Sequence, residues 1–264
     1  MDKTLQYAFN KYKIDIESLS KKDRLSEGDV MDILLVYGGA KPASVIELKG
    51  LGNYNKKTNS TRVDKKEIKM MENILTEIGL KYKTEKGFSE EDLYLEKRGQ
   101  SVKVEGCKIE YVSFLISKNQ KNLEGLSNAL SSKPHNTEKI GIALGYGKNS
   151  SKNMEGDWTD YMVSVVQDKK KGEYVPEELA TLSFVPDPNN YKSKSVMNVA
   201  KKNAKALKSV APEYYEKHVN SWNTMVNTAS TKEEDDGLVL SIKTPRSAGF
   251  INFFTEKKKK SKSR

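Results

Sequence analysis

The stretch Cys107-Lys-Ile-Glu-Tyr-Val-Ser-Phe-Leu-Ile116 decides the fold class, because it is the strongest β-strand signal in the chain. Its Val, Ile, Tyr and Phe side chains are types that are enriched in strands. Weaker extended segments precede it at 80–84, 93–96 and 102–104. Because these strand signals follow one another without an intervening helix, the sequence predicts a mostly antiparallel sheet.

Helical patterns lie on both sides of these strands. The clearest covers 64–78, where Asp64 and Glu67 form a capping-box-like pair and Gly79 stands at the expected C-cap. The segment after Ser26 is apolar on nearly every side, which predicts a buried helix ending at Gly38. Further helices are predicted at 4–19, 117–130, 136–144, 158–165, 191–211 and 212–226, and further strands at 44–48, 179–185 and 237–242.

This order of elements predicts an α+β fold, in which a mostly antiparallel sheet packs against helices and the C-terminal half is rich in helix. Residues 1–255 are expected to form a single domain, which could be sub-divided near 147–157. Flexible joints are predicted at 85–91, 147–156 and 230–236. The last nine residues, 256–264, are predicted to be a disordered Lys-rich tail.

One Cys and two His among 264 residues exclude several classes of protein. A single Cys forms neither an intramolecular disulfide nor a Cys-based zinc or iron–sulfur site, and two His are too few for a histidine-rich metal centre. We therefore predict no metal and no cofactor. No apolar run approaches the ~18 residues of a membrane span, and the N-terminus lacks a signal peptide's apolar stretch, so a soluble cytoplasmic protein without a membrane partner is expected.

The formal net charge of +10 comes from two places. The tail holds six cations and one anion, and its charge centres on Lys257, Lys258, Lys259 and Lys260. The segment 191–226 holds seven Lys against two Glu, and the rest of the chain is balanced. Both basic segments are expected to attract polyanions.

The segment 191–211 is amphipathic on a helical wheel at about 100° per residue. One side is apolar, with Val196, Ala200, Ala204, Leu207 and Ala211, and the other carries five lysines, Lys194, Lys201, Lys202, Lys205 and Lys208. This lysine face could contact nucleic-acid phosphates, or it could be an ordinary solvated face. Because Lys lacks the planar fork with which Arg reads base edges, such binding would be largely independent of sequence.

No motif for catalysis stands out. Gly147-Lys148 lacks the earlier Gly of a phosphate-binding loop, since Ile142 occupies that position, and Asn149 replaces the required hydroxyl residue. Cys107 begins an apolar strand and is expected to be a buried structural thiol. His218 shares a helix stripe with Tyr215, Trp222 and Met225. It is either a packed, hydrogen-bonded histidine at the core edge or a functional group, namely a general base or a pH-sensitive group.

Three short runs carry a further signal: 138–146 (EKIGIALGY), 182–186 (LSFVP) and 39–46 (GAKPASVI). They resemble segments of an uncharacterised, mainly archaeal family known as domain of unknown function 483. The run 138–146 (EKIGIALGY) looks like the segment that leads into a Leu-Gly-Tyr-Pro-x-Cys-Cys motif of that family. The run 182–186 (LSFVP), followed by a Lys- and Ala-rich helix, is similar to a Phe-Ile-Pro-Cys segment. The run 39–46 (GAKPASVI) is similar to a Lys-Pro-Ala stretch near the N-terminus of family members.

The family's cysteines are missing from this chain. Gly147, Asn149 and Ser150 stand where the motif has Pro and two Cys, and Asp187 stands where Cys follows Phe-Ile-Pro. The resemblance therefore implies a divergent member without a Cys-dependent site. A polar pocket formed by Tyr146, Asn149, Ser150, Asp187 and His218 is the candidate remnant of that site, and its oxygen atoms could hold a cation.

Two functions follow as hypotheses. The first is a non-enzymatic binding module that makes salt-sensitive contacts with nucleic acid or a ribonucleoprotein through the lysine face and the tail. The second is an enzyme, or a protein with a degenerate metal site, that uses the polar pocket.

Overall fold

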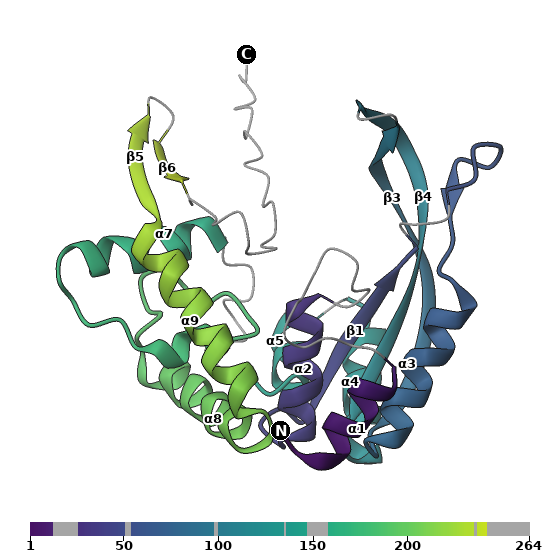
Figure 1. The fold of residues 1–264 in the computed structure, drawn as a ribbon, viewed down its shortest axis with the longest axis horizontal. Helices are drawn as coiled ribbons and strands as arrows, with labels where there is room; N and C mark the ends of the chain where they lie inside the picture. The colour runs from purple at the N-terminus through teal and green to yellow at the C-terminus, as the bar shows by residue number, and fades with distance from the viewer. Residues whose placement is uncertain are drawn as a thin grey trace.

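The computed structural model describes residues 1–12, 26–50, 54–97, 100–134, 136–146, 158–234 and 237–241. The fold is α+β, as predicted from the sequence (Figure 1). Its strands are β1 (Ala43–Lys49), β2 (Ser60–Thr61), β3 (Lys81–Lys97), β4 (Gln100–Ser117), β5 (Ser230–Glu234) and β6 (Gly237–Ser241). Its helices are α1 (Lys3–Lys11), α2 (Glu27–Tyr37), α3 (Lys65–Glu77), α4 (Gln120–Ser131), α5 (Thr137–Ala143), α7 (Trp158–Lys170), α8 (Lys194–Val210) and α9 (Pro212–Thr228), with a 3₁₀ helix η1 (Glu177–Thr181).

Strand β4 is the centre of the main sheet, as the strength of its sequence signal predicts. One of its edges pairs antiparallel with β3 along nearly the whole length of both strands. Its other edge pairs antiparallel with β1 and, further along, parallel with the short β2. The β3–β4 hairpin extends beyond β1 and projects from the body of the protein (Figure 1). Within the described residues, no strand pairs with the outer edge of β3.

Helices cover both faces of this sheet. Ile46, Val112 and Phe114 point into the large core that also contains the buried side chains of α2 and α3. Leu115 points to the opposite face, where it packs against Leu123 and Leu126 of α4. The alternation of adjacent residues in β4 between two cores follows from the two-residue period of a strand.

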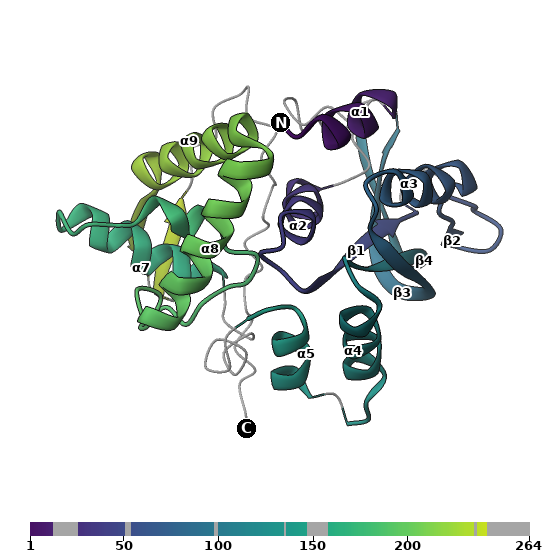
Figure 2. The ribbon, with the colours of Figure 1, turned by 90° about the horizontal axis from the view of Figure 1, so that it is seen from below.

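Helix α2 lies between the sheet and the helices of the C-terminal half (Figure 2). Ser26 caps it and forms a capping box with Asp29. Six of its residues are buried, Val30, Met31, Ile33, Leu34, Leu35 and Val36. They share one hydrophobic core with residues from the sheet and from α7, α8 and α9. The prediction of a buried, all-round apolar helix is confirmed.

Two local predictions were wrong. Residues 85–91 were predicted to be a flexible joint, but they lie inside β3. Gly87 allows the strand to continue there, because a Cβ at that position would lie 2.3 Å from the hydroxyl oxygen of Tyr111 on β4. Residues 179–185 were predicted to be a strand, but η1 ends at Thr181, whose hydroxyl donates to the carbonyls of Glu178 and Ala200. These bonds dock the segment on α8 and replace a strand ladder.

Other boundaries moved by a few residues. The first helix was predicted to reach Leu19, but α1 begins at Lys3 and ends at Lys11, and Tyr12 is its C-cap. The helix predicted to begin at Ser117 is capped by Asn119, because Ser117 belongs to β4. The joint predicted at 230–236 largely forms β5, and the joint at 147–156, like the tail at 256–264, lies outside the described residues.

We predict that Leu34→Ala lowers the free energy of unfolding by about 3 kcal/mol, because the side chain is fully buried and its removal leaves a cavity. Ile142→Ala, at an exposed apolar residue of α5, should change it by less than about 0.5 kcal/mol. Both tryptophans, Trp158 and Trp222, lie in the C-terminal half, so their fluorescence reports on that half. A urea transition that shifts by circular dichroism but not by tryptophan fluorescence would show that α2 does not stabilise the C-terminal helices.

Candidate functional site

Helix α8 presents the lysine face to solvent. Its buried side contains Val196, Ala200, Asn203, Ala204, Ala206 and Leu207. Its exposed side contains all five predicted lysines, Lys194, Lys201, Lys202, Lys205 and Lys208. Lys194 and Lys208 are fourteen residues apart, so at 1.5 Å per residue the face is about 21 Å long. The prediction of an amphipathic helix is confirmed, with bounds of Lys194–Val210.

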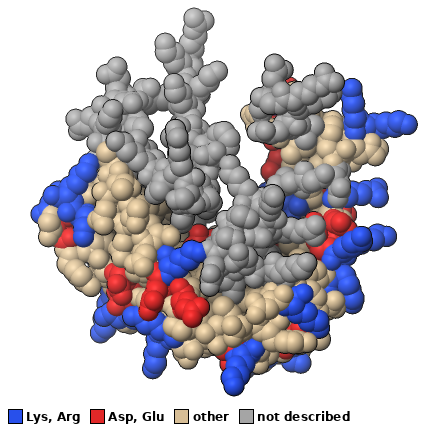
Figure 3. All heavy atoms as spheres, in the orientation of Figure 1, with Lys and Arg blue, Asp and Glu red and all other residues tan. Residues whose placement is uncertain are grey.

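The five lysines differ in their surroundings. The Nζ atom of Lys208 lies 3.8 Å from the Oε1 atom of Glu177 and 4.5 Å from the ring centre of Tyr215. Within the part of the chain that the structure describes, the other four lysines have no ion pair or hydrogen bond to the protein. At the lower left of Figure 3, over α8 and α9, Lys and Arg side chains lie among Asp and Glu side chains. Four ammonium groups on this face are therefore available to an anionic partner.

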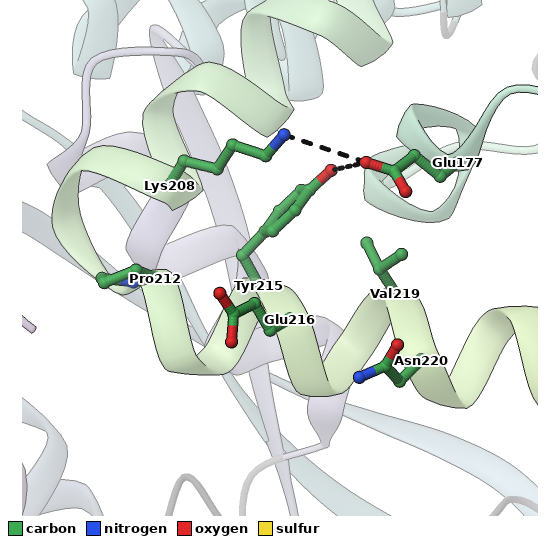
Figure 4. Close-up of a pocket in the computed structure, with 7 residues that line it drawn as sticks. All are labelled: Glu177, Lys208, Pro212, Tyr215, Glu216, Val219 and Asn220. Carbon is green, nitrogen blue, oxygen red and sulfur yellow. Dashed lines mark hydrogen bonds and ion pairs between the residues drawn. The ribbon is translucent and has the colours of Figure 1, made fainter.

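An open pocket of about 410 Å³ lies at the C-terminal end of this face (Figure 4). Its walls come from α8, α9 and η1, with Glu177, Lys208, Pro212, Tyr215, Glu216, Val219 and Asn220. The Tyr215 hydroxyl donates to Glu177 at 3.0 Å, and burial together with this carboxylate raises the pKa of Tyr215. Two carboxylates against one ammonium make this end of the lysine face unfavourable for phosphate.

Sequence reasoning missed this pocket. Glu177 lies 31 positions before Lys208 in the chain, so no local spacing connects them. The contact exists because η1 docks on α8 through Thr181 and Asn203, whose amide donates to the Thr181 carbonyl at 2.9 Å.

The structure places Tyr146 against the segment that follows η1. Its hydroxyl donates to the carbonyl of Ser183 at 3.0 Å, and its ring packs 4.6 Å from that of Phe184. Gly145 permits this position, since it has φ +88° and a Cβ there would lie 2.4 Å from Pro42. The segments 138–146 and 182–186 are thus in contact. Asn149 and Ser150, the other predicted residues of this part of the pocket, lie outside the described residues.

Asp187 is engaged in its own turn. Its Oδ1 atom accepts from the backbone N–H of Asn189 at 3.0 Å, and its Oδ2 atom accepts from the side chain of Asn190 at 2.8 Å. These two hydrogen bonds lower the pKa of Asp187. Such a side-chain turn accounts for an Asp at this position without a ligand.

His218 bridges α9 to two other elements. Its Nδ1 atom lies 2.5 Å from the Oε1 atom of Glu27 on α2, and its Nε2 atom lies 2.7 Å from the carbonyl of Ala180 on η1. Both partners offer acceptor oxygens, and these contacts raise the pKa of His218, so they favour the imidazolium form, in which both ring nitrogens donate. Tyr214 stacks on the ring at 5.7 Å. Of the two readings left open by the sequence, this geometry matches the packed histidine at the core edge.

A second polar cluster, which sequence reasoning missed, surrounds Lys41. Its Nζ atom lies 2.9 Å from the Oδ1 atom of Asp32 on α2, 3.0 Å from the Ser44 hydroxyl and 3.1 Å from the Ser183 hydroxyl. The Ser44 hydroxyl donates to the other oxygen of Asp32 at 2.5 Å. The side chain of Lys41 is 3% exposed. Asp32, the one acid among the apolar residues 30–36 of α2, was the available signal, because a largely covered carboxylate needs a partner.

The Lys41 cluster joins α2, β1 and the segment after η1. All three N–H donors of the ammonium are used by protein acceptors, so the group has no donor left for a substrate. The ammonium also stands 5.3 Å from the ring centre of Tyr146. This arrangement is that of a structural tie between distant segments.

Comparison with known proteins returns no match: no family model, no curated protein and no solved structure matches this chain. The resemblance to the archaeal family stays a prediction.

Among the residues that the structure describes, no group of three or more His, Cys, Asp or Glu side chains could hold a metal ion. No described helix is both long enough and apolar enough to cross a membrane. Cys107, the lone cysteine, is buried between Leu93 and Ile109, and burial raises its pKa.

We predict that Lys41→Met lowers the free energy of unfolding by about 3 kcal/mol, because it leaves the carboxylate of Asp32 without its cation. Lys69→Met is the matched control: Lys69 pairs with Glu72 on the surface of α3, so its loss should cost less than about 0.5 kcal/mol. Chemical denaturation measures both. Equal losses would contradict the role of Lys41 as a tie.

The His218 bridge predicts a pH dependence of stability. Burial alone would lower the pKa of His218, but the hydrogen bond and charge of Glu27, with the Ala180 carbonyl, outweigh burial and raise the pKa. The stabilisation is therefore complete below the unfolded-state pKa of about 6.5, and it is lost as the pH rises through the folded-state value.

His218→Gln should remove this decline on the alkaline side. It should also cost about 2 kcal/mol at pH 6, because the neutral amide of Gln replaces a charged donor that serves both partners. Unfolding free energies measured between pH 5 and 9 test the sign. A wild-type protein that becomes more stable as the pH rises through this range, by an amount that His218→Gln abolishes, would contradict it.

Proposed function

We propose that this chain is a cytoplasmic, non-enzymatic binding protein that contacts nucleic acid or a ribonucleoprotein through the lysine face of α8, together with the Lys-rich tail at 256–264. The observation that carries the proposal is the set of four exposed lysines that have no ion pair or hydrogen bond to any residue that the structure describes, Lys194, Lys201, Lys202 and Lys205. Ordinary surface lysines can also be unpaired, so the spacing of these four along one helix face is the distinguishing feature.

The physical basis is the release of counterions from a polyanion. Each ammonium that neutralises a phosphate releases condensed cations, so affinity falls as salt rises. Lys208 pairs with Glu177, and Glu216 lines the same pocket. Lys208 should therefore contribute less to binding than the other four lysines. Because no arginine lies on this face of α8, contacts would be with the backbone of the nucleic acid rather than with base edges.

We predict that replacing Lys194, Lys201, Lys202 and Lys205 by Gln in the full chain weakens binding to a labelled 20-nucleotide RNA at 50 mM salt. For a single strand, each phosphate contact contributes about −0.7 to the slope of log affinity against log salt. If all four lysines make contact, the slope of the variant should therefore be shallower by about 3. Fluorescence anisotropy over a series of salt concentrations measures both quantities.

The matched control replaces four exposed lysines elsewhere, Lys65, Lys66, Lys69 and Lys81, by Gln. It removes the same charge from α3 and the start of β3. A loss of affinity equal to that of the α8 variant would mean that only net charge matters and would contradict the proposal. Gln at Lys257, Lys258, Lys259 and Lys260 tests the tail in the same assay. If the unmodified chain does not bind the RNA, the proposed roles of the lysine face and of the tail are both wrong.

The alternative hypothesis, an enzyme or degenerate metal-site protein with a pocket near Tyr146, is less well supported. Both carboxylate oxygens of Asp187 are used inside its own turn, and His218 is held by Glu27 and Ala180. The contact of Tyr146 with Ser183 and Phe184 is explained by packing. Nucleic-acid binding is therefore the function we propose.

A further inference from the structure

The turn between α7 and η1 combines positive charge with the most exposed aromatic ring among the described large apolar residues. Lys169, Lys170 and Lys171 are exposed at the end of α7, and Tyr174 follows them with 77% of its surface exposed. In Figure 3, Lys and Arg side chains gather at the left edge, over the end of α7 in Figure 1. An exposed ring beside lysines is typical of surfaces that bind single-stranded nucleic acid.

This turn is fixed to the beginning of α8. Lys192, two residues before α8 begins, lies 2.8 Å from the Oδ2 atom of Asp168 and 3.0 Å from the Oε2 atom of Glu173. The hydroxyl of Tyr191 donates to the same Asp168 oxygen at 2.5 Å. These contacts have two consequences: they hold the turn beside the N-terminal end of the lysine face, and they pair both carboxylates of the turn with a cation.

The two ends of the lysine face therefore differ. The Lys208 end carries Glu177 and Glu216, which repel phosphate. The Lys194 end adjoins the turn with its three lysines and Tyr174. A strand that lies along α8 is favoured electrostatically to continue toward the turn and not toward the pocket.

We propose that the turn extends the lysine face and that the ring of Tyr174 stacks on an unpaired base, which makes single-stranded nucleic acid the preferred partner. This inference rests on the proposed function. An exposed ring can stack on a base that is free of its own neighbours, whereas the bases of a duplex are already stacked and paired. The lysines attract either form, and Tyr174 discriminates between them.

The test compares Tyr174→Leu, which removes the flat ring, with Tyr174→Phe, which keeps it. Anisotropy with a labelled 20-nucleotide single strand and with the duplex of the same length should show about tenfold weaker binding of Tyr174→Leu to the single strand. Duplex affinity and the salt slope should be unchanged, and Tyr174→Phe should match the wild type. Tyr7→Leu, at a ring of α1 that is 63% exposed, is the matched control and should bind normally.

The outcomes separate the two proposals. Wild-type protein that binds neither nucleic acid overturns both. If the wild-type protein binds, two results would overturn only the role of Tyr174. In the first, Tyr174→Leu weakens binding to the single strand and to the duplex equally. In the second, Tyr174→Leu weakens neither. Vesicles containing anionic lipid form a third arm of the assay. If they bind more tightly than the single strand and Tyr174→Leu weakens that binding, the ring contacts a lipid surface and the inference is wrong.

Discussion

The arrangement of the described helices and strands depends on the burial of α2 between the sheet and the C-terminal helices. A helix that is apolar on nearly every side cannot be stable on a surface, so it requires covering elements on both sides. The sheet supplies one cover and the C-terminal helices supply the other, within one hydrophobic core. Two of the three acids of this helix, Glu27 and Asp32, contact His218 and Lys41 from distant parts of the chain. Electrostatic pairing thus adds specificity to a contact that is mainly apolar.

The parts of the fold that could be predicted are those encoded by neighbouring residues. The burial of α2, the capping role of Ser26, the Pro212 start of α9 and the long strand at Cys107–Ile116 all follow from local patterns. The wrong predictions fall where tertiary contacts override them. Residues 85–91 are mainly polar and would not form a strand alone, but pairing with β4 holds them in one. The apolar run after Glu178 would suit a strand, but its side-chain bonds to α8 hold it in a 3₁₀ turn.

The same distinction applies to the candidate site. The lysine face of α8 could be predicted because a helical wheel needs only one helix. The different environment of Lys208 could not, because Glu177 comes from another element. The turn at Tyr174 was also missed, since its relevance depends on Lys192 tying it to the start of α8. The contacts of Tyr146 with Ser183 and Phe184 join two segments that are far apart in the sequence, and packing explains them.

The long outer edge of β3 has a consequence for behaviour at high concentration. A free strand edge offers unpaired backbone donors and acceptors to the same edge of another molecule, which is a common route to aggregation. About half of the residues of β3 are charged, including Lys81, Lys83, Glu85 and Lys86. Two such edges brought together would have to bury or oppose these charges, so the composition of β3 protects the protein from joining its own copies into an extended sheet. The charge of this chain therefore has a second physical use, colloidal stability, which is separate from any attraction between α8 and a polyanion.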